Sequence, residues 1–294
     1  MIRTLRTLFA AAAAFVLACA MPALAQESPT LKKIKAAGEI SIGHREASVP
    51  FAYMDKAGKP IGYSVDLCLK IVDEIKKELT APNLKVKFVA INAQTRIPLI
   101  ANGTIDIECG STTNNLTRAK QVDFLPVTFI TGSKLLVKKG SGIKSLNDLN
   151  GKRASISSGT TNERAFLAEV EKRKLKVEAV MVKDHPLAML NLESGRVDAY
   201  ASDDVLLYGM ISTAKDPSQW EVVGEFFSYD PYGLMIPRND SEYRLLATRV
   251  LADLMRSGEM EKIYDKWFNP GPTNIKIPLS ADLKKAFSIQ ALPY

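Results

Sequence analysis

The chain has 294 residues, a formal net charge of +7 and 46% hydrophobic residues, which is enough for one large domain or two lobes. Basic residues alternate with acidic ones, as in residues 65–77, so they form a solvated helix face and not a stripe that binds nucleic acid. No cluster of base-stacking aromatic residues accompanies them, so the composition argues against a nucleic-acid partner.

Residues 1–25 have the pattern of a secretory signal peptide. A charged start precedes the apolar, alanine-rich run 8–21, and residues 23–25 form a small-x-small cleavage site. The run is short for a membrane span. The stretch 16–19 loosely resembles a lipobox, but the later Ala-x-Ala site fits better, so we expect a periplasmic protein without a lipid anchor. Removal of this segment leaves 37 basic and 32 acidic residues, a net charge of +5.

Short apolar strands alternate with amphipathic helices in the first half of the mature chain. The helix expected at 66–79 places Cys68, Ile71 and Ile75 on one apolar face. The other elements expected here are three strands and a short helix, at 40–43, 85–91, 105–109 and 95–101.

The same alternation continues after a glycine-containing breaker at 140–142. It predicts strands at 133–139, 154–157, 177–182, 197–202, 221–227 and 232–236. Helices are expected at 145–149, from 161 to about 174, at 188–192, and in two closing segments at 241–256 and 259–267. This pattern predicts an α/β fold with mostly parallel sheets.

Polar residues gather where these strands end. Open α/β sheets bind ligands beyond the carboxyl ends of their strands. The candidate site residues at such positions are Arg45, Ser111, Thr113, Thr161 and Asp203.

Three arginines, Arg45, Arg96 and Arg118, lie at the edges of expected strands and helices, next to hydroxyl-bearing and small residues. A planar guanidinium offers a fixed fork of donors that matches a carboxylate edge-on. Three such groups converging on one cleft would suit a small ligand with two carboxylates.

The segment 158–163 is a strand-to-helix turn in which Thr160 and Glu163 have the spacing of a capping box. It is either an ordinary capped helix or an anion site, because a helix N-terminus offers free amides. The segment lacks the phosphate-binding pattern of nucleotide sites. His185 and His44 are far apart and no cysteine pair adjoins them, so we expect no zinc site.

Signatures of catalysis are thin. The chain lacks the Gly-x-Ser-x-Gly and His-Glu-x-x-His patterns. Asp203 and Asp204 could act as an acid–base pair, but one cation-binding carboxylate plus one helix N-cap is the simpler interpretation.

Cys68 and Cys109 remain after signal removal. An even number of cysteines in an oxidising compartment favours one disulfide, for which the helix carrying Cys68 must pack on the strand carrying Cys109. The alternative is two buried thiols that never meet.

Several segments resemble the periplasmic polar amino-acid binding proteins of ABC transporters, and most closely the type that binds acidic amino acids. They are GHREASVPF at 43–51, GYSVD at 62–66, NGTIDIECGSTTNN at 102–115, SGTT at 158–161, KDH at 183–185 and YDKWF at 264–268. The resemblance covers about residues 30–270, and its most specific part lies at 107–115.

This resemblance implies the two-lobe type II binding-protein fold, with the ligand in the interlobe cleft and two hinge strands. Lobe 1 would comprise 26–131 and 230–294, and lobe 2 residues 132–229. The implied ligand is L-glutamate or L-aspartate, the implied partner is a membrane permease, and we expect a monomer without cofactor or metal.

The resemblance also implies residue roles. The α-carboxylate would bind Arg118 and the Thr161 turn, the ammonium would bind Ser111, Thr113 and Asp203, and the acidic side chain would bind Arg45, Arg96 and His185. Close relatives carry a serine where this chain has Ala93, which leaves the choice between glutamate and aspartate open.

Two other classes remain as alternatives. A dehydratase on the same scaffold would need a general acid or base aimed at the substrate, and Asp203 is the one candidate. A receptor's ligand-sensing domain would need a membrane span or signalling domain, which the sequence does not show.

Overall fold

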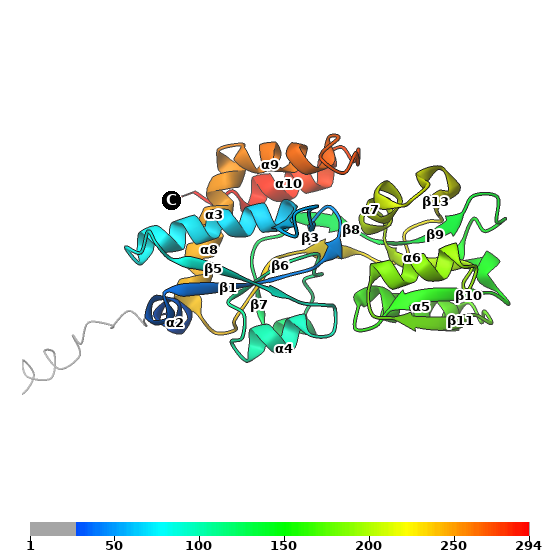
Figure 1. The fold of residues 1–294 in the computed structure, drawn as a ribbon, viewed down its shortest axis with the longest axis horizontal. Coiled ribbons are helices and arrows are strands. Elements are labelled where there is room, and N and C mark those ends of the chain that lie inside the picture. Colours follow the sequence, from blue (N-terminus) through cyan, green and yellow to red (C-terminus); the bar gives the residue numbers. More distant parts are fainter. Residues whose placement is uncertain (1–27, 294) are drawn as a thin grey trace, which may run out of the picture.

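The computed structural model describes residues 28–293, which form two lobes side by side (Figure 1). Each lobe is built on one five-stranded sheet with helices on both faces. The predicted signal peptide and the lipobox-like stretch lie outside the described residues. Among those residues, no helix combines the length and apolar character needed to cross a membrane.

Lobe 1 contains the sheet with strand order β5-β1-β6-β15-β7. These strands are β5 (Lys85–Ala90), β1 (Glu39–His44), β6 (Ile107–Cys109), β15 (Met235–Ile236) and β7 (Asp123–Phe124). A small second sheet is formed by β2 (Ala47–Ser48), β3 (Ala52–Met54) and β4 (Pro60–Ile61).

Helices cover both faces of the lobe 1 sheet. The larger apolar core lies on one face, where Ile71, Leu251 and Trp267 pack from three different helices. A smaller core around Ile100 and Ile105 includes the helix α4. The helical segments of this lobe are α2 (Pro29–Ala37), α3 (Tyr63–Glu78), α4 (Arg96–Ala101), η1 (Arg118–Lys120), α8 (Ser241–Arg256), α9 (Glu259–Phe268) and α10 (Ala281–Gln290).

Lobe 2 contains the sheet with strand order β11-β10-β12-β9-β13. Alternate residues of β9 face opposite layers, so Leu135 joins one apolar core and Leu136 the other. The strands are β9 (Ser133–Lys138), β10 (Arg153–Ser157), β11 (Glu178–Val182), β12 (Ala199–Asp203) and β13 (Trp220–Val223). The helical segments are η2 (Leu146–Leu149), α5 (Thr161–Lys172), α6 (His185–Glu193), α7 (Asp204–Thr213) and η3 (Pro217–Gln219).

Each sheet has one strand that runs against the other four. In lobe 1 it is β15, which is antiparallel to both β6 and β7. In lobe 2 it is β9, which is antiparallel to both β12 and β13. The remaining pairings are parallel, as predicted. The carboxyl ends of the parallel strands therefore lie at one edge of each sheet.

The reversed strands follow the two connections between the lobes. Strand β8 (Phe129–Thr131) precedes β9, strand β14 (Asp230–Tyr232) precedes β15, and β8 and β14 pair with each other. The chain thus enters each sheet from the cleft side, against the direction of the parallel strands. The lobe boundaries at 131/132 and 229/230 adjoin this pair of hinge strands and remain a prediction.

Some sequence-based expectations were wrong in detail. The strand expected at 221–227 ends at Val223, because Gly224 adopts a positive φ of 84° that interrupts extended backbone. The segment 232–236 does not form one strand, since β14 and β15 belong to different sheets. A third closing helix, α10, follows the two that were expected.

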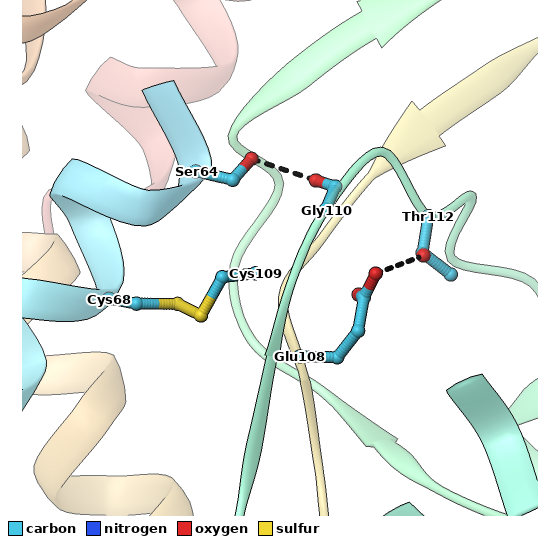
Figure 2. The surroundings of a disulfide bond; sticks show 6 residues. All are labelled: Ser64, Cys68, Glu108, Cys109, Gly110 and Thr112. Carbon is cyan, nitrogen blue, oxygen red and sulfur yellow. Dashed lines mark hydrogen bonds between the residues drawn. A yellow bond between two sulfur atoms is a disulfide. The ribbon is translucent and has the colours of Figure 1, made fainter. Parts of the chain in front are cut away.

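A disulfide joins Cys68 of α3 to Cys109 of β6, with a Cα–Cα distance of 6.2 Å (Figure 2). This confirms the predicted pairing. Beside it, the Ser64 hydroxyl donates a hydrogen bond to the Gly110 carbonyl at 2.7 Å. The disulfide and this bond together hold the loop that begins at Ser111 against α3.

Candidate functional site

A narrow polar pocket lies between the lobes at the carboxyl ends of the parallel strands. It contains seven of the eight predicted site residues; Arg118 lies outside its lining, next to Thr113. The cavity has a volume of about 20 Å³, so the lobes are closed and must move apart to admit a ligand. The lining comprises Arg45, Arg96, Ser111 and Thr113 from lobe 1, and Ser157, Thr160, Thr161, Asn162, His185, Ser202, Asp203 and Leu206 from lobe 2.

The three arginines are buried, each with 3% of its surface exposed. Arg96 donates to the Thr112 hydroxyl at 2.7 Å, and Arg118 donates to the Thr113 carbonyl at 2.8 Å. Each guanidinium nevertheless keeps a buried nitrogen without a hydrogen-bond partner: Nε of Arg45, Nε of Arg96 and Nη2 of Arg118. Unpaired buried donors cost several kcal/mol, so this arrangement favours an anionic ligand that supplies acceptors.

Electrostatic repulsion within this group is partly offset by a buried carboxylate. Burial and the neighbouring charges of Arg118 and Arg45 lower the pKa of Arg96 to about 9. Glu108 in β6 opposes this shift, and its Oε1 accepts a hydrogen bond from the Thr112 hydroxyl at 3.0 Å. Burial raises the pKa of Glu108, while the three arginines lower it.

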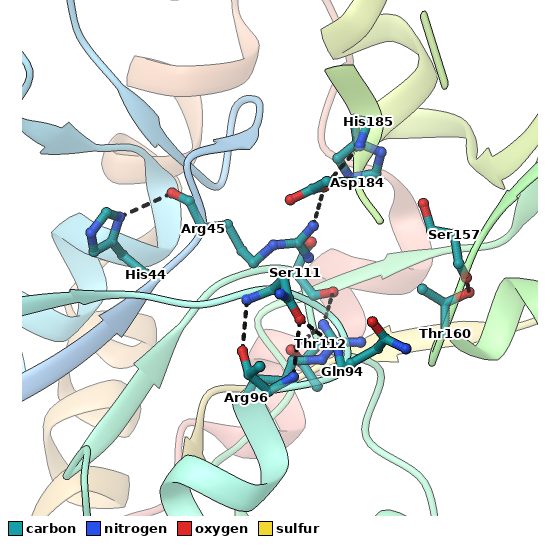
Figure 3. A network of polar contacts seen from close by, with 12 residues as sticks. His44, Arg45, Gln94, Arg96, Ser111, Thr112, Ser157, Thr160, Asp184 and His185 are labelled. Atoms are coloured by element: carbon teal, nitrogen blue, oxygen red, sulfur yellow. Dashed lines mark hydrogen bonds and ion pairs between the residues drawn. The ribbon is translucent and has the colours of Figure 1, made fainter. Parts of the chain in front are cut away.

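His185 is the first residue of α6, and its ring contacts the buried side chain of Tyr200. Its Nδ1 lies 2.9 Å from the Tyr200 hydroxyl, which lies 2.8 Å from the Ser157 hydroxyl. Its Nε2 is buried and has no hydrogen-bond partner. Burial lowers the pKa of His185 to about 4, although Asp184 acts in the opposite direction. Figure 3 shows His185 on the same side of the cleft as Asp184, facing the arginines.

The opposite part of the pocket is lined by acceptors. The Asp203 carboxylate accepts hydrogen bonds from Asn162 Nδ2 at 2.7 Å and from the Tyr232 hydroxyl. Burial, and then the nearby charge of Asp230, raise the pKa of Asp203 to about 7. The Ser111 hydroxyl is buried without a partner. Hydroxyl oxygens and a carboxylate are the acceptors that an ammonium group requires.

Two local interpretations need correction. Thr160 caps α5 through Glu163 N, as expected, but the Glu163 carboxylate accepts from Gly159 N and not from the backbone of Thr160. Of the pair Asp203 and Asp204, Asp203 occupies the N-cap position of α7, but its side chain makes no capping hydrogen bond. Asp204 is the first residue of α7, and its Oδ1 accepts from the Thr131 hydroxyl of the hinge at 2.7 Å. Asp204 therefore links α7 to β8.

Sequence reasoning missed three charged residues near the cleft: Glu108, Asp184 and Asp230. Asp184 was identifiable as an N-cap, since it precedes His185 and Pro186, but its contact with Arg45 was not. Asp230 accepts from the Thr113 hydroxyl at 2.8 Å. Among residues 28–293, no group of three or more His, Cys, Asp or Glu side chains is arranged to hold a metal ion.

Comparison with known proteins agrees with this architecture. The L-glutamate/L-aspartate-binding protein of Pseudomonas aeruginosa is 47% identical over 270 residues, which cover 90% of this chain and 89% of the relative. The glutamate/aspartate import solute-binding protein of Salmonella typhimurium is 46% identical, covering 88% of this chain and 87% of that protein.

A solved structure has the same fold. An ancestral arginine-binding protein bound to glutamine is 31% identical, with a TM-score of 0.70, and the match covers 79% of this chain and 98% of that one. The family model for bacterial extracellular solute-binding proteins, family 3, matches residues 40–270. The chain therefore belongs to the bacterial extracellular solute-binding proteins of family 3.

Proposed function

We propose that this protein captures L-glutamate or L-aspartate in the periplasm and delivers it to the permease of an ABC transporter. The names of two relatives, which share 46–47% identity with it over most of their length, support this ligand class. The observation that carries the proposal is the set of unpaired nitrogens on three buried arginines. An acidic amino acid brings two carboxylates to meet them.

The arrangement of the pocket supports a division of roles. Arg118 and Thr161 hold the α-carboxylate, which every amino acid has. Arg45, Arg96 and His185 bind the side-chain carboxylate.

The ammonium group takes the remaining acceptors, Ser111, Thr113 and Asp203. Ala93 adjoins the turn before α4, and its carbonyl lies close to Gly159 across the cleft, so the loop before Arg96 faces the start of α5. The methyl group of Ala93 cannot form a hydrogen bond with the ligand. Binding of the ligand's side-chain carboxylate therefore depends more strongly on Arg45 and Arg96.

A dehydratase on this scaffold is not favoured. The relatives with specific names are solute-binding proteins. Both oxygens of Asp203 already accept hydrogen bonds from the protein, and the ammonium group occupies what remains of its acceptor capacity. No catalytic role is therefore assigned to it.

Calorimetry with glutamate, aspartate, glutamine and asparagine tests the proposal. The two acids should bind at least about 100-fold more tightly than the two amides, because a neutral side chain offers no negative charge to the unpaired nitrogens of the buried arginines. The matched pair glutamate and glutamine is the decisive comparison, since the two differ in charge and hardly in size. Equal affinity for both would refute the proposed ligand class.

A further inference from the structure

An ion pair between Arg45 and Asp184 crosses the cleft directly. Arg45 follows β1 of lobe 1 and its Nη2 contacts Oδ1 of Asp184, which precedes α6 of lobe 2 (Figure 3). The side chains of Arg45 and Asp184 are 4% and 21% exposed, so solvent screens this pair only weakly. The two residues are 139 positions apart in the chain. Their contact therefore depends on how the lobes are placed.

The Asp184 carboxylate is fixed to lobe 2. It is the N-cap of α6, and the same Oδ1 accepts a hydrogen bond from His185 N at 2.8 Å. A negative charge at this position is also stabilised by the helix dipole. Because the backbone of α6 holds this carboxylate, Asp184 moves with lobe 2. The ion pair with Arg45 therefore breaks when the lobes part and forms again when they close.

Arg45 retains binding capacity while it contacts Asp184. A guanidinium has five N–H donors on three nitrogens, and the Asp184 carboxylate accepts a hydrogen bond from one of these nitrogens, Nη2. Its Nε remains buried without a partner, and Arg45 is one of the residues that line the pocket. One arginine can thus hold the lobe 2 carboxylate on one side and an anion in the cleft on the other.

We propose that Asp184 is a latch: it pairs with Arg45 when the lobes close, orients its guanidinium toward the cleft, and slows release of the bound ligand. This rests on the proposed role of Arg45 in binding an acidic side chain. Asp184 is not among the residues that line the pocket, so its proposed role is that of a positioning residue. It should stabilise the closed complex with glutamate and aspartate to a similar extent.

The test is Asp184→Asn, which removes the charge but keeps a good N-cap, since Asn and Asp cap helices about equally well. Release of radiolabelled glutamate into excess unlabelled glutamate should become about tenfold faster or more, as is typical when a buried charge pair loses one partner. The association rate should change little, and the melting temperature of the ligand-free protein should fall by no more than about 4 °C, the effect of losing one charge at a helix N-terminus. The affinities for glutamate and aspartate should fall by similar factors.

The matched control is Asp216→Asn, an exposed N-cap in the same lobe whose carboxylate accepts from Ser218 N at 3.0 Å. It should leave glutamate release unchanged. The latch is refuted if Asp184→Asn leaves release unchanged, or if it tightens binding, which would make Asp184 a competitor for Arg45. If the unmodified protein fails to bind either acid, the proposed function fails first, so the two failures are distinguishable.

Discussion

The hydroxyls of Thr113 and Thr161 lie 3.0 Å apart, and they join lobe 1 to lobe 2. Thr113 donates its single proton to Asp230 Oδ1 at 2.8 Å, so Thr161 must be the donor in the bond between the two threonines. Asp230 belongs to the hinge strand β14. One chain of hydrogen bonds thus connects the start of α5, the loop after β6 and the hinge.

These hydrogen bonds predict that substitutions of the adjacent residues Thr160 and Thr161 affect different properties of the protein, stability and ligand affinity. Thr161→Val removes the hydrogen bond between the Thr161 and Thr113 hydroxyls, which joins the closed lobes. The loss of one neutral hydrogen bond should weaken glutamate binding by about 3- to 10-fold, with little change in the stability of the protein. Thr160→Val removes the N-cap of α5, so it should lower the free energy of unfolding by about 1 kcal/mol. Calorimetry and urea unfolding measure the two effects. If Thr161→Val destabilised the free protein as much as Thr160→Val does, the assigned roles would be wrong.

Arg118 should hold the α-carboxylate whatever the ligand's side chain is. Arg118→Ala should weaken glutamate and aspartate alike, by at least about 100-fold, because it removes a buried, charge-assisted contact. Arg118→Lys keeps the charge but loses the fork, so it should restore affinity only in part. Calorimetry with both ligands checks this. A changed ratio of the two affinities would place Arg118 at the side chain instead.

The disulfide should contribute to stability and hardly to binding. It closes a segment whose ends are 41 positions apart, so chain entropy predicts a loss of about 4 kcal/mol in the double variant Cys68→Ala, Cys109→Ala. Glutamate affinity should change little, because the Ser64 hydroxyl still holds Gly110. Urea unfolding of the ligand-free protein measures the difference. Equal unfolding midpoints for the two proteins would contradict this prediction.

Local sequence patterns predicted the regular elements well. The helix at 241–256 was expected with the bounds that α8 has, because its apolar residues repeat at helical spacing between clear end signals. The strands β2 and β4 have two residues each and β3 has three, too few to display any period. Sequence reasoning could name most of the residues that gather around one pocket, because parallel strands align their carboxyl ends at one edge.

Contacts between the lobes were beyond the reach of sequence patterns. Arg45 and Asp184 share no local spacing, and their contact exists because the hinge brings two separately folded sheets together. The same holds for Asp203 and Tyr232, whose hydrogen bond joins the end of β12 to a hinge strand. The sequence contains these residues, but their partners are fixed by the closure of the cleft.

Asp203 predicts one pH dependence of binding. Its pKa of about 7 in the ligand-free protein means that part of the population is protonated near neutrality. An ammonium group favours the carboxylate, so binding lowers this pKa and releases protons, and the Asp203 contribution to affinity rises with pH up to about 7. Asp203→Asn should weaken glutamate binding by about 30-fold or more and abolish this proton release.

Calorimetry at pH 6.5 in buffers of different ionisation enthalpy counts the protons exchanged on binding. In the variant, Oδ1 of the asparagine can still accept from Asn162 Nδ2, and its Nδ2 can donate to the Tyr232 hydroxyl, which turns to accept, so the asparagine should be accommodated. Unchanged proton release in Asp203→Asn would assign the titration to another group.

His185 is expected to change glutamate affinity with pH in the opposite direction to Asp203. Its pKa of about 4 in the ligand-free protein makes it neutral at pH 7, and a side-chain carboxylate near Nε2 favours the imidazolium. Binding then raises the pKa and takes up protons. The His185 contribution to affinity is therefore greatest below about pH 4 and falls as pH rises, until it levels off above the pKa of the complex.

The variant His185→Gln isolates the contribution of His185 protonation to glutamate affinity, because glutamine keeps a hydrogen-bond donor and cannot be charged. The contribution of Asp203 is common to both proteins, so the ratio of variant to wild-type Kd for glutamate reports on His185 alone. This ratio should be largest at pH 5 and decrease toward pH 8, since the glutamate complex of the wild-type protein loses the imidazolium over that range. Calorimetry at four pH values measures it. A ratio that stays constant from pH 5 to 8 would mean that His185 binds as a neutral donor, or only begins its helix.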